Sequence, residues 1–139
     1  EDALGSLNSL CALRERAGAV TVDLVCLELG SGKAAVYKWG AAASYLLDGS
    51  SVQKLGAVNP PPGIQVTDKR HSCCQVTLRR EQTMLLLVSD GLEESRVIQA
   101  CRGQPTPQAL AGALLENTHT EGEDDATLVT IQLQMARSG

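Results

Sequence analysis

The apolar run Met84–Val88, which leads directly into Ser89-Asp90-Gly91, constrains the fold of this chain more than any other segment. An apolar run of this length that ends at a glycine-marked turn predicts a buried strand. Near the C-terminus, the acidic pair Asp124-Asp125 stands just before a second apolar segment, which predicts a final strand over residues 127–133. Two buried strands can hold the carboxylates at their ends close together at one edge of a packed sheet.

The rest of the chain predicts strands joined by hairpins, with helices before and after them. Apolar residues at helical spacing predict helices over residues 3–16, from 92 or 93 to 102, and over 107–117, the last with Thr106 as its cap and Pro107 in the first position. Further strands are predicted over residues 20–29, 33–39, 45–47, 52–55 and 73–78, with turns at Gly30-Ser31-Gly32 and Asp48-Gly49. Seven strands and three helices in this order predict an α+β fold with a largely antiparallel sheet.

Length and composition limit the class of protein. The chain of 139 residues has the size of one domain, residues 1–139, and its hydrophobic content of 43% is that of a globular protein. A net charge of −4 and an aromatic content of 2% argue against a nucleic-acid partner, which needs a basic surface and rings for base stacking. No apolar run approaches the ~20 residues of a membrane span, so we expect no membrane contact by this segment.

The five cysteines are odd in number and show no Cys-x-x-Cys spacing, which argues against a disulfide scaffold or a zinc site. His71, Cys73 and Cys74 resemble a soft-metal cluster in composition, but on a strand Cys74 points away from the other two. We therefore interpret the cysteines as free thiols. Reduced thiols indicate a cytoplasmic protein.

Asp90, Gly91, Asp124 and Asp125 are the candidate site residues. Carboxylate oxygens are the ligands that Mg²⁺ and Mn²⁺ prefer, and a glycine after Asp90 permits a positive φ or a close backbone approach. Each motif has a simpler alternative, since Asp90 can cap the following helix and acidic pairs in loops are usually solvated. Because both motifs end apolar strands, and because a Thr127 side-chain hydrogen bond can fix the second loop, the combination favours a metal site for phosphate chemistry.

Asp23 has two interpretations. The alternation of Val22 and Leu24 places its side chain on the opposite face of its strand. It is then either a solvent-face aspartate that bonds to a nearby turn, which we favour, or a group close to the catalytic edge.

The chain also resembles a known family. The order of the segments LNSLCALRE, TVDLVCLELGSGKAAVYKWGAAASYLL, NPPPGI, MLLLVSDGLEE and DDATLVTIQL resembles the metal-dependent type 2C (PPM) protein serine/threonine phosphatases, in the bacterial branch typified by stage II sporulation protein E. The resemblance covers nearly the whole chain, from about residue 7 to 133. Ala43 stands where that family usually has proline.

The resemblance implies an αββα sandwich with two Mn²⁺ or Mg²⁺ ions at one end of the sheets. Asp90 and Asp124 would be catalytic metal ligands, with Gly91 beside them and Asp125 in the outer shell or as an alternative ligand. The implied reaction is hydrolysis of phosphoserine or phosphothreonine by metal-bound hydroxide. The implied substrate is a phosphorylated regulatory protein, such as an anti-anti-sigma factor of a sporulation pathway.

One departure from the family pattern qualifies this expectation. The family has an upstream Asp-Gly segment that completes the metal centre, whereas the remaining Asp-Gly of this chain, Asp48-Gly49, lies in a predicted hairpin. We therefore expect a single domain truncated at the N-terminus, inactive or weakly active alone. Its exposed sheet edge or its helices would favour a homodimer. The alternative function is a non-catalytic module that keeps the phosphatase scaffold and binds a partner.

Overall fold

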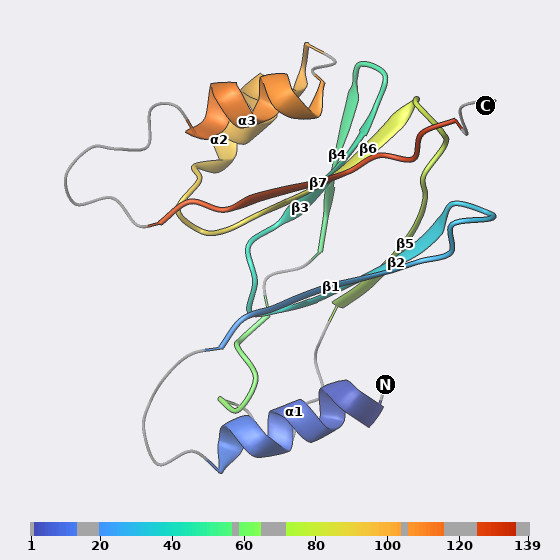
Figure 1. Cartoon of the computed structure of the whole chain (residues 1–139). Helices are drawn as coiled ribbons and strands as arrows, with labels where there is room; N and C mark the ends of the chain where they lie inside the picture. The colour runs from blue at the N-terminus through green and yellow to red at the C-terminus, as the bar shows by residue number, and fades with distance from the viewer. Residues whose placement is uncertain are drawn as a thin grey trace.

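The computed structural model describes residues 2–13, 20–56, 59–64, 72–103, 106–115 and 125–135 and shows two antiparallel sheets packed face to face (Figure 1). The three-stranded sheet has the order β1-β2-β5, formed by Val22–Leu27, Lys33–Trp39 and Ser72–Thr77. The four-stranded sheet has the order β4-β3-β6-β7, formed by Ser51–Leu55, Ser44–Asp48, Thr83–Val88 and Leu128–Ile131. The helices are α1 (Asp2–Ala12), α2 (Glu94–Cys101) and α3 (Pro107–Leu115). The predicted α+β class is confirmed.

The hairpins form where the turn residues predicted them. In the turn between β1 and β2, the Gly32 N–H donates to the Glu28 carbonyl at 2.8 Å. Gly32 has a φ of +73°, and a Cβ at this position would lie 2.2 Å from the Leu78 carbonyl oxygen, so the turn requires glycine. The β3–β4 hairpin closes on the Asp48–Ser51 pair, around the predicted Asp48-Gly49 turn.

The inner faces of the two sheets form one hydrophobic core. Val36 of β2 and Leu85 of β6 are completely buried there, together with Leu55 and Leu78. Val25 and Leu27 of β1 pack against this core, so β1 turns Asp23, Val25 and Leu27 inward. The predicted alternation of β1 holds, but the face that was expected to be buried is the outer one, where Leu24 is 42% exposed.

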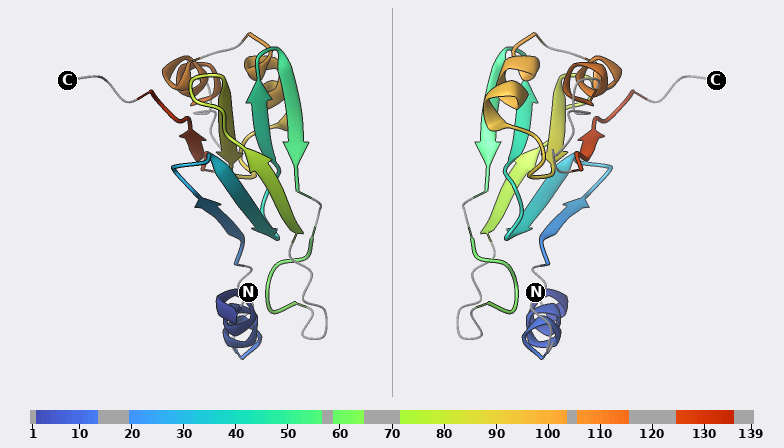
Figure 2. Two further views of the ribbon diagram at one scale, coloured as in Figure 1. Left: turned by 90° about the vertical axis from the view of Figure 1, so that its right-hand side faces the viewer. Right: turned by 90° about the vertical axis from the view of Figure 1, so that its left-hand side faces the viewer.

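Helices α2 and α3 cover the other face of the four-stranded sheet and form a second core (Figure 2). Strand β6 has apolar residues at every position from Met84 to Val88 because one set of side chains contacts the helices and the other set faces the second sheet. The predicted cap of α3 is confirmed, since the Ala109 N–H donates to Thr106 Oγ1 at 3.2 Å.

Helix α1 lies at the end of the three-stranded sheet, beside the proline-rich loop 59–64 (Figure 1). The Gly63 N–H donates to Asn8 Oδ1 at 2.8 Å and joins this loop to the helix. The predicted end of this helix at residue 16 lies outside the described residues. None of the helices in the described ranges is long and apolar enough to cross a membrane.

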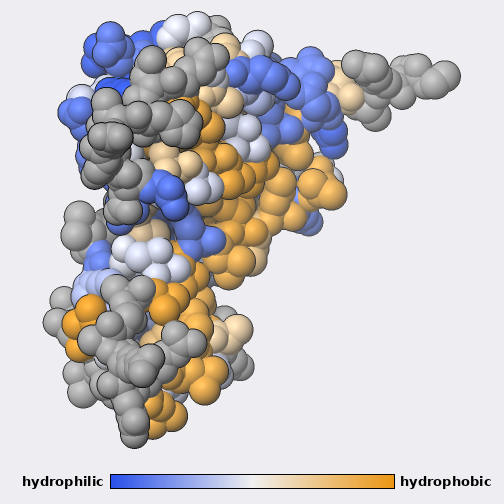
Figure 3. Space-filling view, turned by 60° about the vertical axis from the view of Figure 1, so that its left-hand side comes forward, coloured by the Kyte–Doolittle hydropathy of each residue, from blue (hydrophilic) through white to orange (hydrophobic). Residues whose placement is uncertain are grey.

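Strands β1 and β7 each end their sheet, on the same side of the sandwich (Figures 1 and 2). Leu24 of β1 and Val129 of β7 are among the exposed large apolar residues, at 42% and 47%. Figure 3, which shows the molecule from an adjacent direction, displays a band of apolar surface across its middle. The sandwich is thus less covered along these two edges than over its helical face.

Candidate metal-binding edge

The turn after β6 presents Asp90 to solvent. β6 lies between β3 and β7 in the four-stranded sheet, so its end is fixed from both sides. The Leu92 N–H donates to the Ser89 carbonyl at 3.3 Å and closes the turn, and the Asp90 side chain is exposed. Helix α2 begins only at Glu94, with Glu93 as its N-cap residue. Asp90 therefore does not cap this helix, and the simpler interpretation of the motif is excluded.

Ser89 joins the turn after β6 to the acidic segment before β7. Its backbone N–H donates to the Thr127 carbonyl at 3.0 Å. Its Oγ accepts from the Thr127 N–H at 2.9 Å and donates to the Asp125 carbonyl at 3.3 Å. Asp90 and Asp125 consequently lie at the same edge of the sheet, as the sequence predicted, and both side chains are exposed. Asp124 lies outside the described residues.

Among the residues that the structure describes, the side chain that fixes the second loop is that of Ser89, and Thr127 contributes its backbone N–H and carbonyl. This role of Ser89 was not predicted from the sequence. Gly91 is not among the glycines with positive φ in the described ranges, so its backbone conformation does not require glycine.

A partly buried ion pair lies beside this edge. Lys38 Nζ contacts Asp23 Oδ2 at 2.5 Å and donates to Ser44 Oγ at 2.8 Å. The side chains of Lys38 and Asp23 are 2% and 22% exposed, and Ser44 is completely buried. Asp23 as a whole residue is exposed, but its carboxylate is paired with Lys38, so the favoured interpretation as a solvent-face aspartate is only partly correct. The sequence did not predict the role of Lys38. The inward alternation of Ala34, Val36 and Lys38 is the signal that would have revealed it.

Two hollows meet at Asp90. One, of about 260 Å³, is lined by Asp23, Asp90 and Thr127 together with the ends of β6 and β7. The other, of about 360 Å³, is lined by Lys38, Lys54, Asp90 and Glu94. The crossover from β2 to β3, residues 40–43, contributes to both. Gly40 in this crossover has a φ of +66°, and a Cβ there would lie 2.6 Å from Pro61 Cα.

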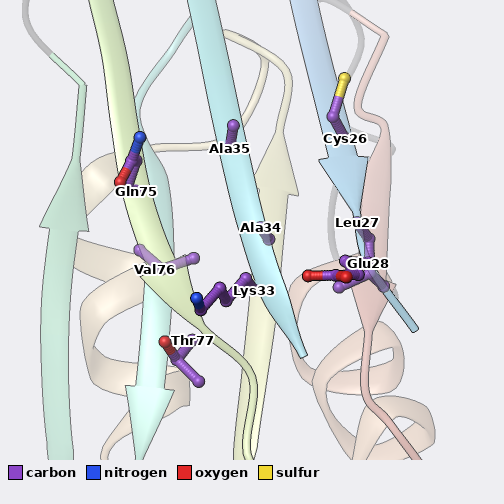
Figure 4. A pocket seen from close by; sticks show the side chains of 9 residues that line it. All are labelled: Cys26, Leu27, Glu28, Lys33, Ala34, Ala35, Gln75, Val76 and Thr77. Atoms are coloured by element: carbon purple, nitrogen blue, oxygen red, sulfur yellow. The ribbon is translucent and has the colours of Figure 1, made fainter. Parts of the chain in front are cut away.

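A larger hollow, of about 630 Å³, lies against the three-stranded sheet (Figure 4). It is lined by residues of β1, β2 and β5 and the turn between β1 and β2, among them Glu28, Lys33 and Gln75. Neither Asp90 nor Asp125 contributes to it. The smaller hollows, both bordered by Asp90, are therefore the candidate site.

The side chains at this edge are of the type that binds a hard divalent cation, but they are few. Asp90 and Asp125 supply carboxylate oxygens, which suit Mg²⁺ or Mn²⁺. Within the described residues no group of three or more His, Cys, Asp or Glu side chains is placed to hold a metal ion. Asp23, which shares a hollow with Asp90, is engaged by Lys38. The described carboxylates thus suit such an ion in kind, but the described residues alone do not make a complete binding shell.

The cysteines form no metal site among the described residues. All five are free thiols, and Cys73 is exposed whereas Cys74 on the opposite face of β5 is partly buried. Burial raises the pKa of the Cys101 thiol to about 11. The predicted absence of disulfides is confirmed for these residues, while His71 lies outside the described ranges.

Solved structures define the class of protein to which this fold and edge belong. The chain is similar to the PP2C phosphatase domain, with a fragment of the regulatory domain, of the cell fate determinant SpoIIE from Bacillus subtilis (26% identity, TM-score 0.76, 95% of this chain and 43% of that chain). It is also similar to the Mn-presoaked phosphatase domain of the same protein (22%, 0.69, 99% and 66%). A third similar structure is the PPM Ser-Thr phosphatase MsPP from Mycobacterium smegmatis (19%, 0.69, 95% and 72%). The fold is that of a PP2C (PPM) phosphatase domain.

The sequence defines the family more narrowly. The chain belongs to the stage II sporulation protein E (SpoIIE) family, whose profile matches residues 1–134. It spans 66% of the solved SpoIIE phosphatase-domain chain and 43% of the longer one. No curated protein sequence matches the chain. The predicted family and the predicted phosphatase-like fold are both confirmed.

Proposed function

We propose that the chain forms most of the catalytic domain of a metal-dependent protein serine/threonine phosphatase. The observation that carries the proposal is the Ser89 connection, which brings the Asp90 turn and the Asp125 segment to one edge of the sheet in a member of the SpoIIE family. The reaction is hydrolysis of phosphoserine or phosphothreonine. Because the chain spans only part of the related domains, the activity is proposed for the full-length protein.

Mn²⁺ or Mg²⁺ is the proposed cofactor, with two ions in the complete site. A SpoIIE phosphatase domain was presoaked with Mn, and the similar protein RsbX was solved in complex with magnesium. In this chain we propose Asp90 and Asp124 as the catalytic metal ligands. Asp125 and the Gly91 backbone lie next to these two ligands in sequence and take part in binding the same ions. When bound, these ions supply an activated water for attack on phosphorus and neutralise the phosphoryl charge.

The residues of this chain hold the ligands in place. Ser89 fixes the backbone of Asp125 and Thr127 against the end of β6, so the two ligand-bearing segments keep a constant separation. Gly40 lets the 40–43 crossover approach Pro61 closely and form a wall of both hollows. A phosphorylated side chain that enters from solvent reaches the exposed Asp90 edge between these walls.

The proposed substrate is a phosphorylated regulatory protein of the anti-anti-sigma type, and family membership supports this proposal. The solved structures with the same fold include the RsbU and RsbW domains of Rv1364c from Mycobacterium tuberculosis and the T6SS regulatory component PppA. We therefore propose a regulatory phosphoprotein, in preference to a small phosphate ester, as the substrate. The free thiols are consistent with a cytoplasmic location, which we propose as well.

Self-association is a further part of the proposal. β1 and β7 are edge strands with exposed Leu24 and Val129, and an uncovered edge can pair with the same edge of a second copy. Sedimentation velocity over a hundredfold range of concentration tests this, and a constant monomer mass would contradict it.

The function is tested by Mn²⁺-dependent phosphate release from a phosphoserine protein by the full-length protein. Asp90→Asn keeps the side-chain size but removes the carboxylate charge, so we expect a loss of at least ~100-fold in kcat/KM, on the scale of single catalytic groups. Asp48→Asn is the matched control, since Asp48 is an exposed carboxylate paired with Arg79 at the opposite end of β3. Equal rates for Asp90→Asn and the wild type would support the non-catalytic module instead.

A further inference from the structure

Lys38 is a charged residue that the proposed function does not yet use. Its side chain is 2% exposed, on the inner face of β2, and its ammonium group contacts Asp23 and Ser44. Burial of an ammonium ion is unfavourable unless the ion is paired and hydrogen-bonded. This arrangement is therefore specific, and it lies at the end of the sandwich that carries Asp90.

Asp23 is placed to influence the metal-binding edge. It lines the 260 Å³ hollow together with Asp90 and Thr127, while Lys38 lines the neighbouring 360 Å³ hollow, which Asp90 also borders. Without Lys38, the Asp23 carboxylate would be an uncompensated negative charge that faces a site already built from carboxylates. Such a charge attracts a divalent cation strongly, because the Coulomb energy grows with the charge of the ion and falls only slowly with distance.

We propose that Lys38 is a fixed internal cation that masks Asp23 and so limits the affinity of the Asp90 edge for divalent ions. This inference rests on the proposed function. Asp23 is then a positioning residue whose negative charge is neutralised by Lys38, and it is not an additional ligand. Ser44 Oγ accepts from Lys38 Nζ at 2.8 Å and directs the ammonium group toward Asp23. An edge that binds a divalent ion with moderate affinity can release the ion. A further unpaired carboxylate would raise the affinity and slow the release.

A purely structural role would need no charge. The pair does connect β1 and β2 to the first residue of β3, but apolar side chains of similar volume often replace a buried ion pair without loss of stability. Lys38 is also too buried to contact a substrate directly. The distinguishing property is the sign of the effect on metal affinity, because removal of Lys38 and removal of Asp23 change the local charge in opposite directions.

Mn²⁺ titration calorimetry on the full-length protein and its variants tests the inference. Lys38→Met is expected to tighten Mn²⁺ binding on the order of tenfold, and Asp23→Asn to weaken it by a similar factor. The double variant, in which both charges are absent, is expected to return to within about threefold of the wild type, and Lys38→Arg should leave the affinity unchanged. Structural damage alone predicts weaker binding in every variant and no rescue in the double one.

Lys54→Met is the matched control. Lys54 borders the same 360 Å³ hollow, but it pairs with Glu94 at the surface, where the side chains are 47% and 50% exposed. Solvent screens this pair, so we expect less than a threefold change in Mn²⁺ affinity.

The outcomes separate this inference from the proposed function. If the wild type binds Mn²⁺ and Asp90→Asn does not, but Lys38→Met and Asp23→Asn bind like the wild type or both bind more weakly without rescue, the inference is overturned and the phosphatase proposal stands. If the wild type does not bind Mn²⁺, or binds it no better than Asp90→Asn, both are overturned.

Discussion

Ser89→Ala tests whether the connection between the two acidic segments creates the site. The substitution removes the acceptor of the Thr127 N–H and the donor to the Asp125 carbonyl, at 2.9 and 3.3 Å, and keeps the backbone bond from the Ser89 N–H to Thr127. A net contribution of about 0.5–1.5 kcal/mol for each intramolecular hydrogen bond gives a loss of about 1–2 kcal/mol, since the Ser89 side chain is only partly buried.

The loss of stability affects mainly the docking of residues 125–127 and affects the sheet much less. Pairing of β7 with β6 does not depend on the Ser89 side chain, so the fold remains. If docking of residues 125–127 weakens by about 1–2 kcal/mol, the binding-competent population falls and Mn²⁺ affinity decreases by roughly five- to thirtyfold, because each 1.4 kcal/mol is a factor of about ten.

Urea unfolding and Mn²⁺ titration of the full-length protein measure the two effects. Ser95→Ala is the control, because Ser95 is exposed on α2 and its hydroxyl donates to the Glu93 carboxylate at 2.5 Å, a bond that does not join the two acidic segments. We expect less than about 0.5 kcal/mol and no change in Mn²⁺ affinity for the control. Wild-type Mn²⁺ affinity in Ser89→Ala would refute the role assigned to this connection.

Two predictions concern the scaffold. Burial raises the pKa of Cys101 to about 11 from an ordinary value of 9.0, so the free energy of unfolding should be constant below pH 9 and fall by up to about 3 kcal/mol as the pH rises toward 11. Urea unfolding at pH 8 to 10.5 measures this component, which Cys101→Ala should abolish. Gly40→Ala, with a φ of +66° and a Cβ position 2.6 Å from Pro61 Cα, should lower the free energy of unfolding by about 1–3 kcal/mol. Gly103→Ala, where a Cβ meets no atom within 4 Å, should change the same unfolding curve little, and equal effects of the two substitutions would contradict the steric argument.

Local signals in the sequence predicted most of the fold. The apolar run of β6, the Asp48-Gly49 turn and the Thr106 cap each depend on residues close together in the chain, so their physical causes are visible without a structure. The same holds for the position of Asp90 after a buried strand. The ends of the elements were predicted less accurately, since β1 begins and ends two residues inside its predicted range.

The part of the site that was not predicted depends on contacts between residues that are far apart in the sequence. Lys38 and Asp23 are 15 residues apart and meet only because β1 and β2 pair in a particular register. Ser89 contacts Thr127 across 38 residues. In β1 the outward Val22 and Leu24 have the same apolar character as the inward Val25 and Leu27, so periodicity selected the wrong face and did not predict the pairing of Asp23 with Lys38.

The division of the core into two clusters has a consequence for local unfolding. The amides of β3 and β6 are enclosed by helices on one face and by the second sheet on the other, so they should exchange hydrogen most slowly. The three-stranded sheet contributes to one cluster and can separate from its partner without exposing the helical core. Asp90 belongs to the four-stranded sheet, while Asp23 and Lys38 belong to the three-stranded sheet. The proposed ligands of a bound ion therefore all lie on the four-stranded sheet, and Mn²⁺ should slow exchange at the adjoining ends of β6 and β7 more than in β1 and β2.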